Sequence, residues 1–328
     1  MFMPASLAMH VAGASKFDVA AIFEKRNNNM PNKRISAFAV LAVSFSSALL
    51  ADRPAFADPA YSVGPQYDTT HVYVAPDDID QFVKSFTETF GGASTKQVVV
   101  TVTPTPSSTS SQLVQTPAGT VSLFGFKTPI PAPFGKERNG FLVTDFDKAV
   151  EAARAAGAIL TVAPFPDPIG RDAVVQWPGG VNMQLYWHNT KPNYEPLKTV
   201  PENRVYLSPD AASAFTEAFL KFSGGKVVSD DKDAAGVEIG RPDYTFRRIR
   251  IDSNFGKMVL LVTDGHLPFP YGHEVTGYET DQLTDTLARA EKSGAKLLAG
   301  PYDSDGRAAA MVSFPGGYIA EIHSLRRP

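Results

Sequence analysis

The chain has 328 residues, of which 43% are hydrophobic, and its formal net charge is −3. This composition is sufficient for a sizeable globular core, and the lack of a basic stripe argues against nucleic-acid binding. Because the chain has no cysteine, it has no thiol nucleophile, no thiolate metal site and no disulfide, which is compatible with export into an oxidising compartment.

Residues 1–57 have the pattern of a secretory signal peptide. A basic pair occupies 33–34, an apolar run follows at 35–50, and residues 55–57 read Ala-Phe-Ala, a small-residue cleavage signal. The apolar run is shorter than the roughly 20 residues that span a bilayer. We therefore expect cleavage before Asp58 and a periplasmic or secreted protein, with an uncleaved anchoring helix as the alternative.

The signal pattern begins at Met30. Residues 1–29 have no place in such a signal, so we expect them to reflect a mis-called start. No other segment of the sequence is long and apolar enough to cross a bilayer, so we expect no membrane association after cleavage.

The first part of the mature chain predicts one strand, one helix and three further strands. Alternation of polar and apolar residues indicates the strands, and two phenylalanines four residues apart lie on one face of the helix. The strands are expected at 71–75, 97–103, 112–115 and 119–126, and the helix at 78–90. Pro-rich connectors at 128–134, 188–201 and 265–272 separate four such quarters, and the middle connector is the expected domain boundary.

Two spacings show that the chain is duplicated. Val72 is matched by Val205, 133 residues later, and this spacing continues without a gap through the helix to a Gly-Gly pair. Pro178 is matched by Pro315, 137 residues later, in an aromatic-Pro-Gly-Gly turn that precedes an alternating strand. Residues 67–188 and 200–324 are therefore predicted to be two copies of one unit.

The pattern of four β-α-β-β-β quarters resembles the vicinal oxygen chelate superfamily, which includes glyoxalase I, bleomycin-resistance proteins and extradiol dioxygenases. The resemblance is carried by the sequence His-Val-Tyr-Val at 71–74, by Gly-Phe-Leu-Val-Thr-Asp at 140–145 before an alanine-rich helix, and by the two Pro-Gly-Gly strands. It implies an α+β fold in which the four modules pair into two tandem glyoxalase-like domains. Each domain would enclose an open barrel-like cavity, where the family holds a divalent metal with His or Gln of a first strand and Glu of a last strand.

The first unit departs from the family's ligand pattern. The resemblance places His71 and Gln184 at two ligand positions, but it places Leu123 where a glutamate is needed and Arg138 at the fourth position. An arginine cannot ligate a metal because its guanidinium stays protonated. One imidazole and one amide are a poor divalent site, so we expect His71 to hydrogen-bond Gln184 in a filled cavity.

The second unit keeps the family's carboxylate at Glu321, but Arg204 takes the place of His71. We expect these two side chains to form a buried ion pair without a metal between them. The alternative is a metal held by Glu321, Glu274 and Asn203, the last of which enters if its strand slips by one residue.

The sequence thus predicts an exported glyoxalase-like protein with a degenerate metal site, which binds a small polar or aromatic ligand in its cavities. The alternatives are a metal-dependent lyase, isomerase or dioxygenase of the glyoxalase type, and a structural or partner-binding protein with filled cavities. No definite cofactor is assigned, a divalent metal being the alternative, and no oligomeric state follows. The candidates are, for catalysis, Glu321 and His71; for ligand binding, His71, Arg138, Gln184, Arg204 and Glu321; and for a metal, His71, Gln184, Glu274 and Glu321.

Overall fold

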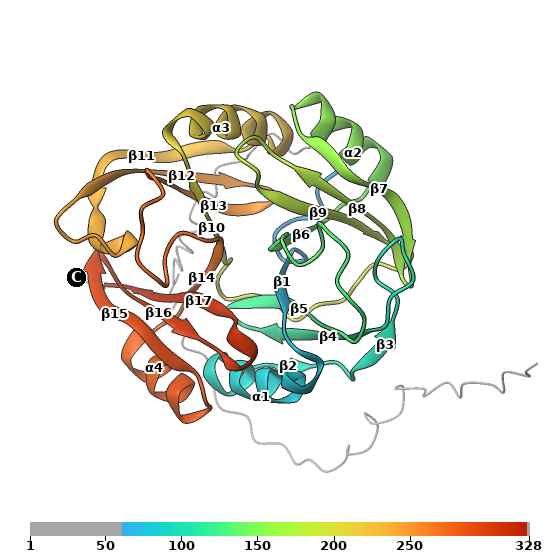
Figure 1. Ribbon diagram of the computed structural model, residues 1–328, viewed down its shortest axis with the longest axis horizontal. Coiled ribbons are helices and arrows are strands. Elements are labelled where there is room, and N and C mark those ends of the chain that lie inside the picture. Colours follow the sequence, from blue (N-terminus) through green and yellow to red (C-terminus); the bar gives the residue numbers. More distant parts are fainter. Residues whose placement is uncertain (1–60, 327–328) are drawn as a thin grey trace, which may run out of the picture. The chain divides into compact units, whose positions relative to one another are not determined.

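The computed structural model describes residues 61–326, which form two curled mixed sheets flanked by four α-helices (Figure 1). The predicted signal peptide, its cleavage site before Asp58 and the start at Met30 lie outside the described residues. No helix in the described part of the chain has the length and apolar character that a membrane crossing requires.

The first sheet contains nine strands in the order β2-β4-β5-β1-β6-β9-β8-β7, with β3 paired to β4. Its strands are β1 (Thr69–Tyr73), β2 (Ala93–Ser94), β3 (Val98–Val100), β4 (Thr109–Thr116), β5 (Gly119–Phe126), β6 (Asn139–Leu142), β7 (Ile159–Asp167), β8 (Gly170–Gln176) and β9 (Asn182–His188). The inner strands β1 and β6 pair antiparallel with each other. On its other side, β1 pairs parallel with β5, and β6 pairs parallel with β9.

The second sheet repeats this arrangement with eight strands in the order β11-β12-β13-β10-β14-β17-β16-β15. Its strands are β10 (Glu202–Leu207), β11 (Lys226–Ala235), β12 (Thr245–Ser253), β13 (Gly256–Val262), β14 (Val275–Glu279), β15 (Lys296–Ser304), β16 (Arg307–Ser313) and β17 (Ile319–Leu325). The chain passes from one sheet to the other through residues 189–201.

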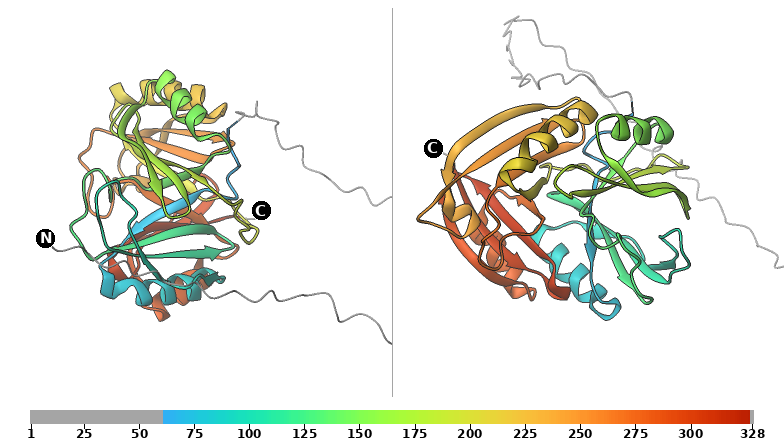
Figure 2. Two further views of the ribbon diagram at one scale, coloured as in Figure 1. Left: turned by 90° about the vertical axis from the view of Figure 1, so that its right-hand side faces the viewer. Right: turned by 45° about the horizontal axis from the view of Figure 1, so that its top comes forward.

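The helices pack across the two units. They are α1 (Ile79–Phe90), α2 (Phe146–Ala155), α3 (Pro209–Ser223) and α4 (Leu283–Lys292), with short 3₁₀ turns η1 (Pro76–Asp78), η2 (Gly236–Ile239) and η3 (Pro315–Gly317). Figures 1 and 2 show α2 beside α3 at one side of the sheets, and α1 beside α4 at the other. Gly224 after α3 adopts the left-handed conformation that glycine tolerates best.

Two hydrophobic cores lie between the sheets and the helices, and both contain residues of both units. One core packs Phe141 and Trp177 of the first unit against Phe215 and Phe219 of α3. The other packs Phe82 of α1 against residues of α4 and β17. Because strand residues alternate between the two faces of a sheet, the remaining strand residues point into the concave side of each unit.

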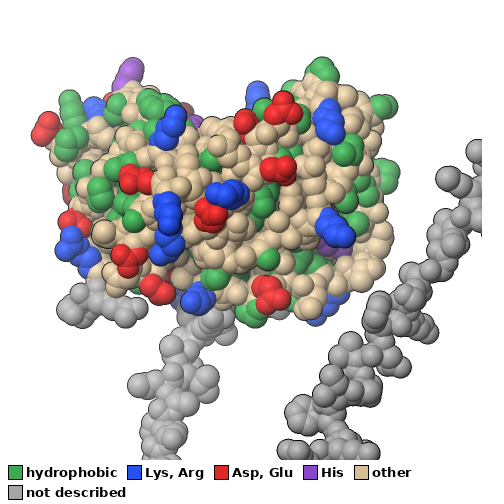
Figure 3. Space-filling view, turned by 90° about the horizontal axis from the view of Figure 1, so that it is seen from below, with side chains coloured by type: hydrophobic (Ala, Val, Ile, Leu, Met, Phe, Trp, Pro, Cys, Tyr) green, Lys and Arg blue, Asp and Glu red, His purple; other side chains and the backbone are tan. Residues whose placement is uncertain are grey.

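The predicted architecture of four quarters in two units is confirmed, with one local difference. The single strand expected at 97–103 is short, and a separate two-residue strand, β2, precedes it. Figure 3 shows the face that carries α1 and α4, where acidic and basic side chains are interspersed.

Candidate functional site

The concave sides of the two units are built alike, as the hydrogen-bonded register shows. Gln184 on β9 lies opposite Gly140 on β6, and Glu321 on β17 lies opposite Gly277 on β14. A side chain at Gly140 would have its Cβ 2.5 Å from Nε2 of His71. The glycine therefore makes room for the side chains on the floor of the cavity.

The first unit encloses an open cavity of about 810 Å³. Its floor is formed by the buried side chains of Thr69, His71, Asp172 and Gln184. Its walls and mouth are mainly apolar and aromatic, and include Tyr73, Val98, Val100, Leu113, Phe124, Phe134, Ile169, Tyr186 and Tyr194. The prediction of a filled first cavity is therefore wrong.

The predicted hydrogen bond between His71 and Gln184 is also absent from the described residues. Gln184 instead hydrogen-bonds the carboxyl of Asp172. Nδ1 of His71 is 3.7 Å from Oε1 of Glu137 and has no hydrogen-bond partner, while the hydroxyl of Tyr73 donates to that same oxygen. Gln184 has a partner other than His71 because the neighbouring strand, β8, supplies the polar side chain of Asp172.

Two floor residues of this cavity were not singled out by the sequence analysis, Thr69 and the acidic Asp172. Asp172 is 5% exposed, and β8 places it directly opposite Tyr186. Burial and the negative charge of Asp167 raise the pKa of Asp172 well above its usual value, although the hydrogen bond from Gln184 opposes this shift. No feature of the local sequence marks it, since an aspartate at the start of a strand is usually a surface residue.

Two other predicted positions of the first unit differ in the structure. Leu123 points away from the cavity into a hydrophobic core, and its neighbour Ser122 lines the cavity instead. Arg138 is not part of the cavity lining. It lies near Glu274 and His273 of the second unit, where its positive charge only partly opposes the burial that raises the pKa of Glu274 to about 8.

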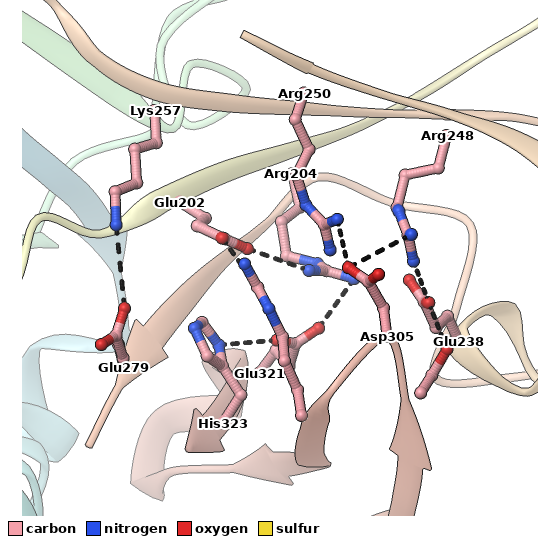
Figure 4. A network of polar contacts seen from close by, with 12 residues as sticks. Glu202, Arg204, Glu238, Arg248, Arg250, Lys257, Glu279, Asp305, Glu321 and His323 are labelled. Atoms are coloured by element: carbon pink, nitrogen blue, oxygen red, sulfur yellow. Dashed lines mark hydrogen bonds and ion pairs between the residues drawn. The ribbon is translucent and has the colours of Figure 1, made fainter. Parts of the chain in front are cut away.

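The second unit is filled by an ion network at the corresponding place (Figure 4). Nη2 of Arg204 is 2.8 Å from Oε2 of Glu321, which confirms the predicted buried ion pair. Nη1 of Arg204 is 3.2 Å from Oε2 of Glu202, whose other oxygen is 2.7 Å from Nη1 of Arg307. Burial alone would raise the pKa of Glu321, but Arg204 and His323 outweigh it and hold that pKa below its usual value.

His323 is fully buried in this network, and its Nδ1 is 2.9 Å from Oε1 of Glu321. Among the described residues, Glu202, Glu321 and His323 form the one group of three possible metal-ligating side chains within 4.8 Å. These residues do not fit a divalent metal, because two arginines already bind the carboxylate oxygens and neutralise their charge. Glu274 does not belong to this group, and Asn203 alternates with Glu202 and Arg204, so it lies on the other face of β10.

A second set of ion pairs in the second unit links β12 to the η2 turn and to the β15–β16 turn. The guanidinium of Arg248 binds the buried Glu238, and its Nη2 is 3.3 Å from Oδ2 of Asp305 in the β15–β16 turn. Arg250 pairs with the same aspartate (Figure 4). These contacts join β12 to the β15–β16 hairpin.

The register identifies which residues hold equivalent places in the two units. At most of the seven positions below, a neutral side chain of the first unit is replaced by a charged one in the second. Two acids of the first cavity run the other way, because Asp172 is matched by Ala309 and Asp167 by Ser304. The pairs, first unit before second, are Thr69 and Glu202, His71 and Arg204, Ser111 and Arg248, Leu113 and Arg250, Pro168 and Asp305, Gln184 and Glu321, and Tyr186 and His323.

The duplication spacing could have revealed more of this network than the predictions used. The spacing that aligns His71 with Arg204 also aligns Thr69 with Glu202. It would therefore have revealed a second position at which a neutral residue is replaced by a charged one. Arg248, which the sequence analysis did not single out, is 2% exposed. Its partner Glu238 comes from the η2 turn, which has no counterpart in the repeat and no sequence signal of its own.

Comparison with solved structures shows the fold of the vicinal oxygen chelate proteins. A triple mutant of 4-hydroxymandelate synthase from Streptomyces coelicolor superposes with a TM-score of 0.56 at 13% identity, over 79% of this chain and 93% of that protein. Homoprotocatechuate 2,3-dioxygenase from Arthrobacter globiformis superposes with a TM-score of 0.53 at 13% identity, over 82% and 81% of the two chains. No family model matches the sequence, and no curated protein matches it significantly.

Proposed function

We propose that this protein is an exported binding protein that holds a small, largely apolar ligand in the cavity of its first unit without a resident metal. The observation that carries the proposal is the contrast between the two units: one has an open cavity of about 810 Å³, and the other is filled by ion pairs.

The size and lining of the first cavity support a ligand role. Pockets for small molecules are typically several hundred Å³ in volume, mainly apolar, and carry a few polar groups that orient the ligand. Here the polar groups are gathered on the floor at His71, Asp172 and Gln184, beneath aromatic walls. A purely structural role with filled cavities is disfavoured, because a stable fold does not require such an opening.

The metal-dependent alternative draws its support from the buried group of Glu202, Glu321 and His323. The arginines at positions 204 and 307 work against that alternative, since each contributes a fixed positive charge where a cation would have to bind. The second unit is better explained as a rigid support whose ancestral cavity has been replaced by paired charges.

A fluorescent dye tests the binding proposal. N-Phenyl-1-naphthylamine is neutral and becomes brighter in apolar cavities, so we expect one saturable site per chain. Ser122→Phe places a ring in the first cavity and should abolish that site, whereas Ser229→Phe, at a half-buried serine of β11, should retain it. Absence of a saturable site in the wild type, or a site unaffected by Ser122→Phe, would contradict the proposal.

Metal analysis tests the metal-free part. Protein purified without chelator and dialysed against metal-free buffer should contain no stoichiometric divalent metal. A tightly held metal that disappears in Glu321→Gln would restore the metalloenzyme alternative. Export is tested separately, since N-terminal sequencing of the secreted product should begin at Asp58 or within a few residues, whereas a full-length cytoplasmic product would contradict export.

A further inference from the structure

We infer that the ligand of the first cavity is an organic cation, an amine or ammonium group on an apolar or aromatic body, with its positive charge beside Asp172. This inference rests on the proposed function, because it names the chemical class that the same cavity binds.

The charges that line the cavity are unbalanced. Two carboxylates face it, Asp172 near the floor and Asp167 near the mouth. The one lysine or arginine of the described lining is Lys191, which is exposed, and no ion pair joins it to either carboxylate within the described residues. The described lining thus offers two carboxyl groups, and one exposed lysine, to whatever enters the cavity.

Within the described residues Asp172 has no ion-pair partner, unlike the three buried glutamates of the ion network in the second unit. In the second unit, Glu202, Glu238 and Glu321 each bind an arginine. Asp172 has only the neutral amide of Gln184. Because a buried carboxylate without a cation is unfavourable, the missing positive charge is the most effective contribution that a ligand could make.

The walls suit the rest of such a molecule. Tyr186 on β9 lies opposite Asp172 on β8. The rings of Tyr73 on β1 and Phe124 on β5 pack together with centroids 5.3 Å apart. Aromatic faces attract organic cations through their quadrupoles, and they also cover an apolar body. An anionic ligand would instead meet two carboxylates and no buried guanidinium.

Three probes that share one naphthyl body test the inference by calorimetry. They are 2-(1-naphthyl)ethylamine, 2-(1-naphthyl)ethanol and 3-(1-naphthyl)propionate, which are cationic, neutral and anionic at pH 7. The amine should bind roughly tenfold or more tightly than the alcohol, as expected for hydrogen bonds to a charged group, and the propionate should bind weakest. An alcohol or propionate that binds as tightly as the amine would overturn the inference but leave the binding proposal intact.

The variant Asp172→Asn assigns the preference to one residue. It should reduce amine affinity to that of the alcohol while alcohol affinity stays unchanged, and the exposed control Asp243→Asn should keep the full preference. Persistence of the preference in Asp172→Asn would overturn the role of this residue. If no probe binds the wild type and the dye has no site, both the inference and the binding proposal fail; the order of affinities in the wild type decides the inference even if the variant does not fold.

Discussion

Arg204 lies at the centre of the buried ion network, and its two carboxylate partners depend on it. Arg204→Ala would leave Glu202 with one arginine and Glu321 with only His323, all three of them buried. We expect a loss of about 3–5 kcal/mol in the free energy of unfolding, as found when one partner of a buried pair is removed. Denaturant titration measures it.

Arg247→Ala is the matched control, because this arginine pairs with Asp230 on the partly exposed outer face of the neighbouring strand. Surface pairs contribute at most about 1 kcal/mol, so the control should change little. Equal effects of the two substitutions would show that Arg204 is not held in a buried pair.

Glu274 predicts a pH dependence of opposite sign to that of a paired acid. Burial raises its pKa from 4.5 to about 8, so folding takes up a proton in this range and stability falls as the pH rises through it. Glu274→Gln cannot ionise and should therefore gain more stability over the wild type at pH 8.5 than at pH 5. Thermal melts at both pH values measure the difference, with Glu217→Gln at an exposed position as control; a gain independent of pH would be inconsistent with a raised pKa.

At the scale of residues, the sequence predicted which two charged side chains pair better than it predicted the surroundings of a polar side chain. The pairing of Arg204 with Glu321 followed from one spacing and one strand polarity, and the structure confirms it. The partner of Gln184 could not be predicted, because it depends on which residue of β8 faces the cavity, and a shift of one residue reverses the face. Leu123 was placed on the cavity face for the same reason, whereas Ser122, one residue earlier, is the residue that lines the cavity.

At the scale of elements, β6 and β14 each use a glycine to let the cavity floor approach the backbone. A Cβ at Gly140 would meet Nε2 of His71 at 2.5 Å, whereas a Cβ at Gly277 would meet Cδ of Arg204 at 3.1 Å. Gly140→Ala should therefore displace the floor of the first cavity, reduce dye affinity and cost about 1–3 kcal/mol of stability through overpacking.

Gly277→Ala is the comparison, since its neighbour has only to shift by a few tenths of an ångström. It should leave dye binding unchanged, and a dye titration of both variants checks this. Equal losses of affinity would mean that the probe does not occupy the first cavity.

Elements were the most predictable part of the chain. The strand at 119–126 and the end of the first helix at Phe90 match the prediction, because alternation, paired phenylalanines and a Gly-Gly stop all agree there. The strand expected at 97–103 shows where such agreement fails. That segment lies at a sheet edge with two of its valines exposed, so little burial exists to set its length.

The whole molecule is held together by cores that neither unit can complete alone. Phe219 of the second unit contacts Trp177 of the first, with ring centroids 5.9 Å apart. Both tryptophans of the described chain, Trp177 and Trp187, belong to the first unit. Tryptophan fluorescence therefore reports the unfolding of the first unit, while far-UV circular dichroism reports both.

We expect these two probes to give one coincident transition. Phe219→Ala, although it lies in the second unit, should lower stability by about 3–5 kcal/mol in both signals, as for other buried phenylalanines. Two separated transitions, or a fluorescence midpoint that Phe219→Ala leaves unchanged, would show that the units unfold independently.

The alternation of side chains along β1 and β5 has a consequence for how this protein can change over evolutionary time. Val72 and Leu123 point into the shared core, while His71, Ser122 and Phe124 point into the cavity. Because the two sets lie on opposite faces, the residues that select a ligand can be exchanged without touching those that hold the units together. Because the second unit is filled by paired charges and does not have to change, substitutions in the lining of the first cavity alone can give the protein a new ligand specificity.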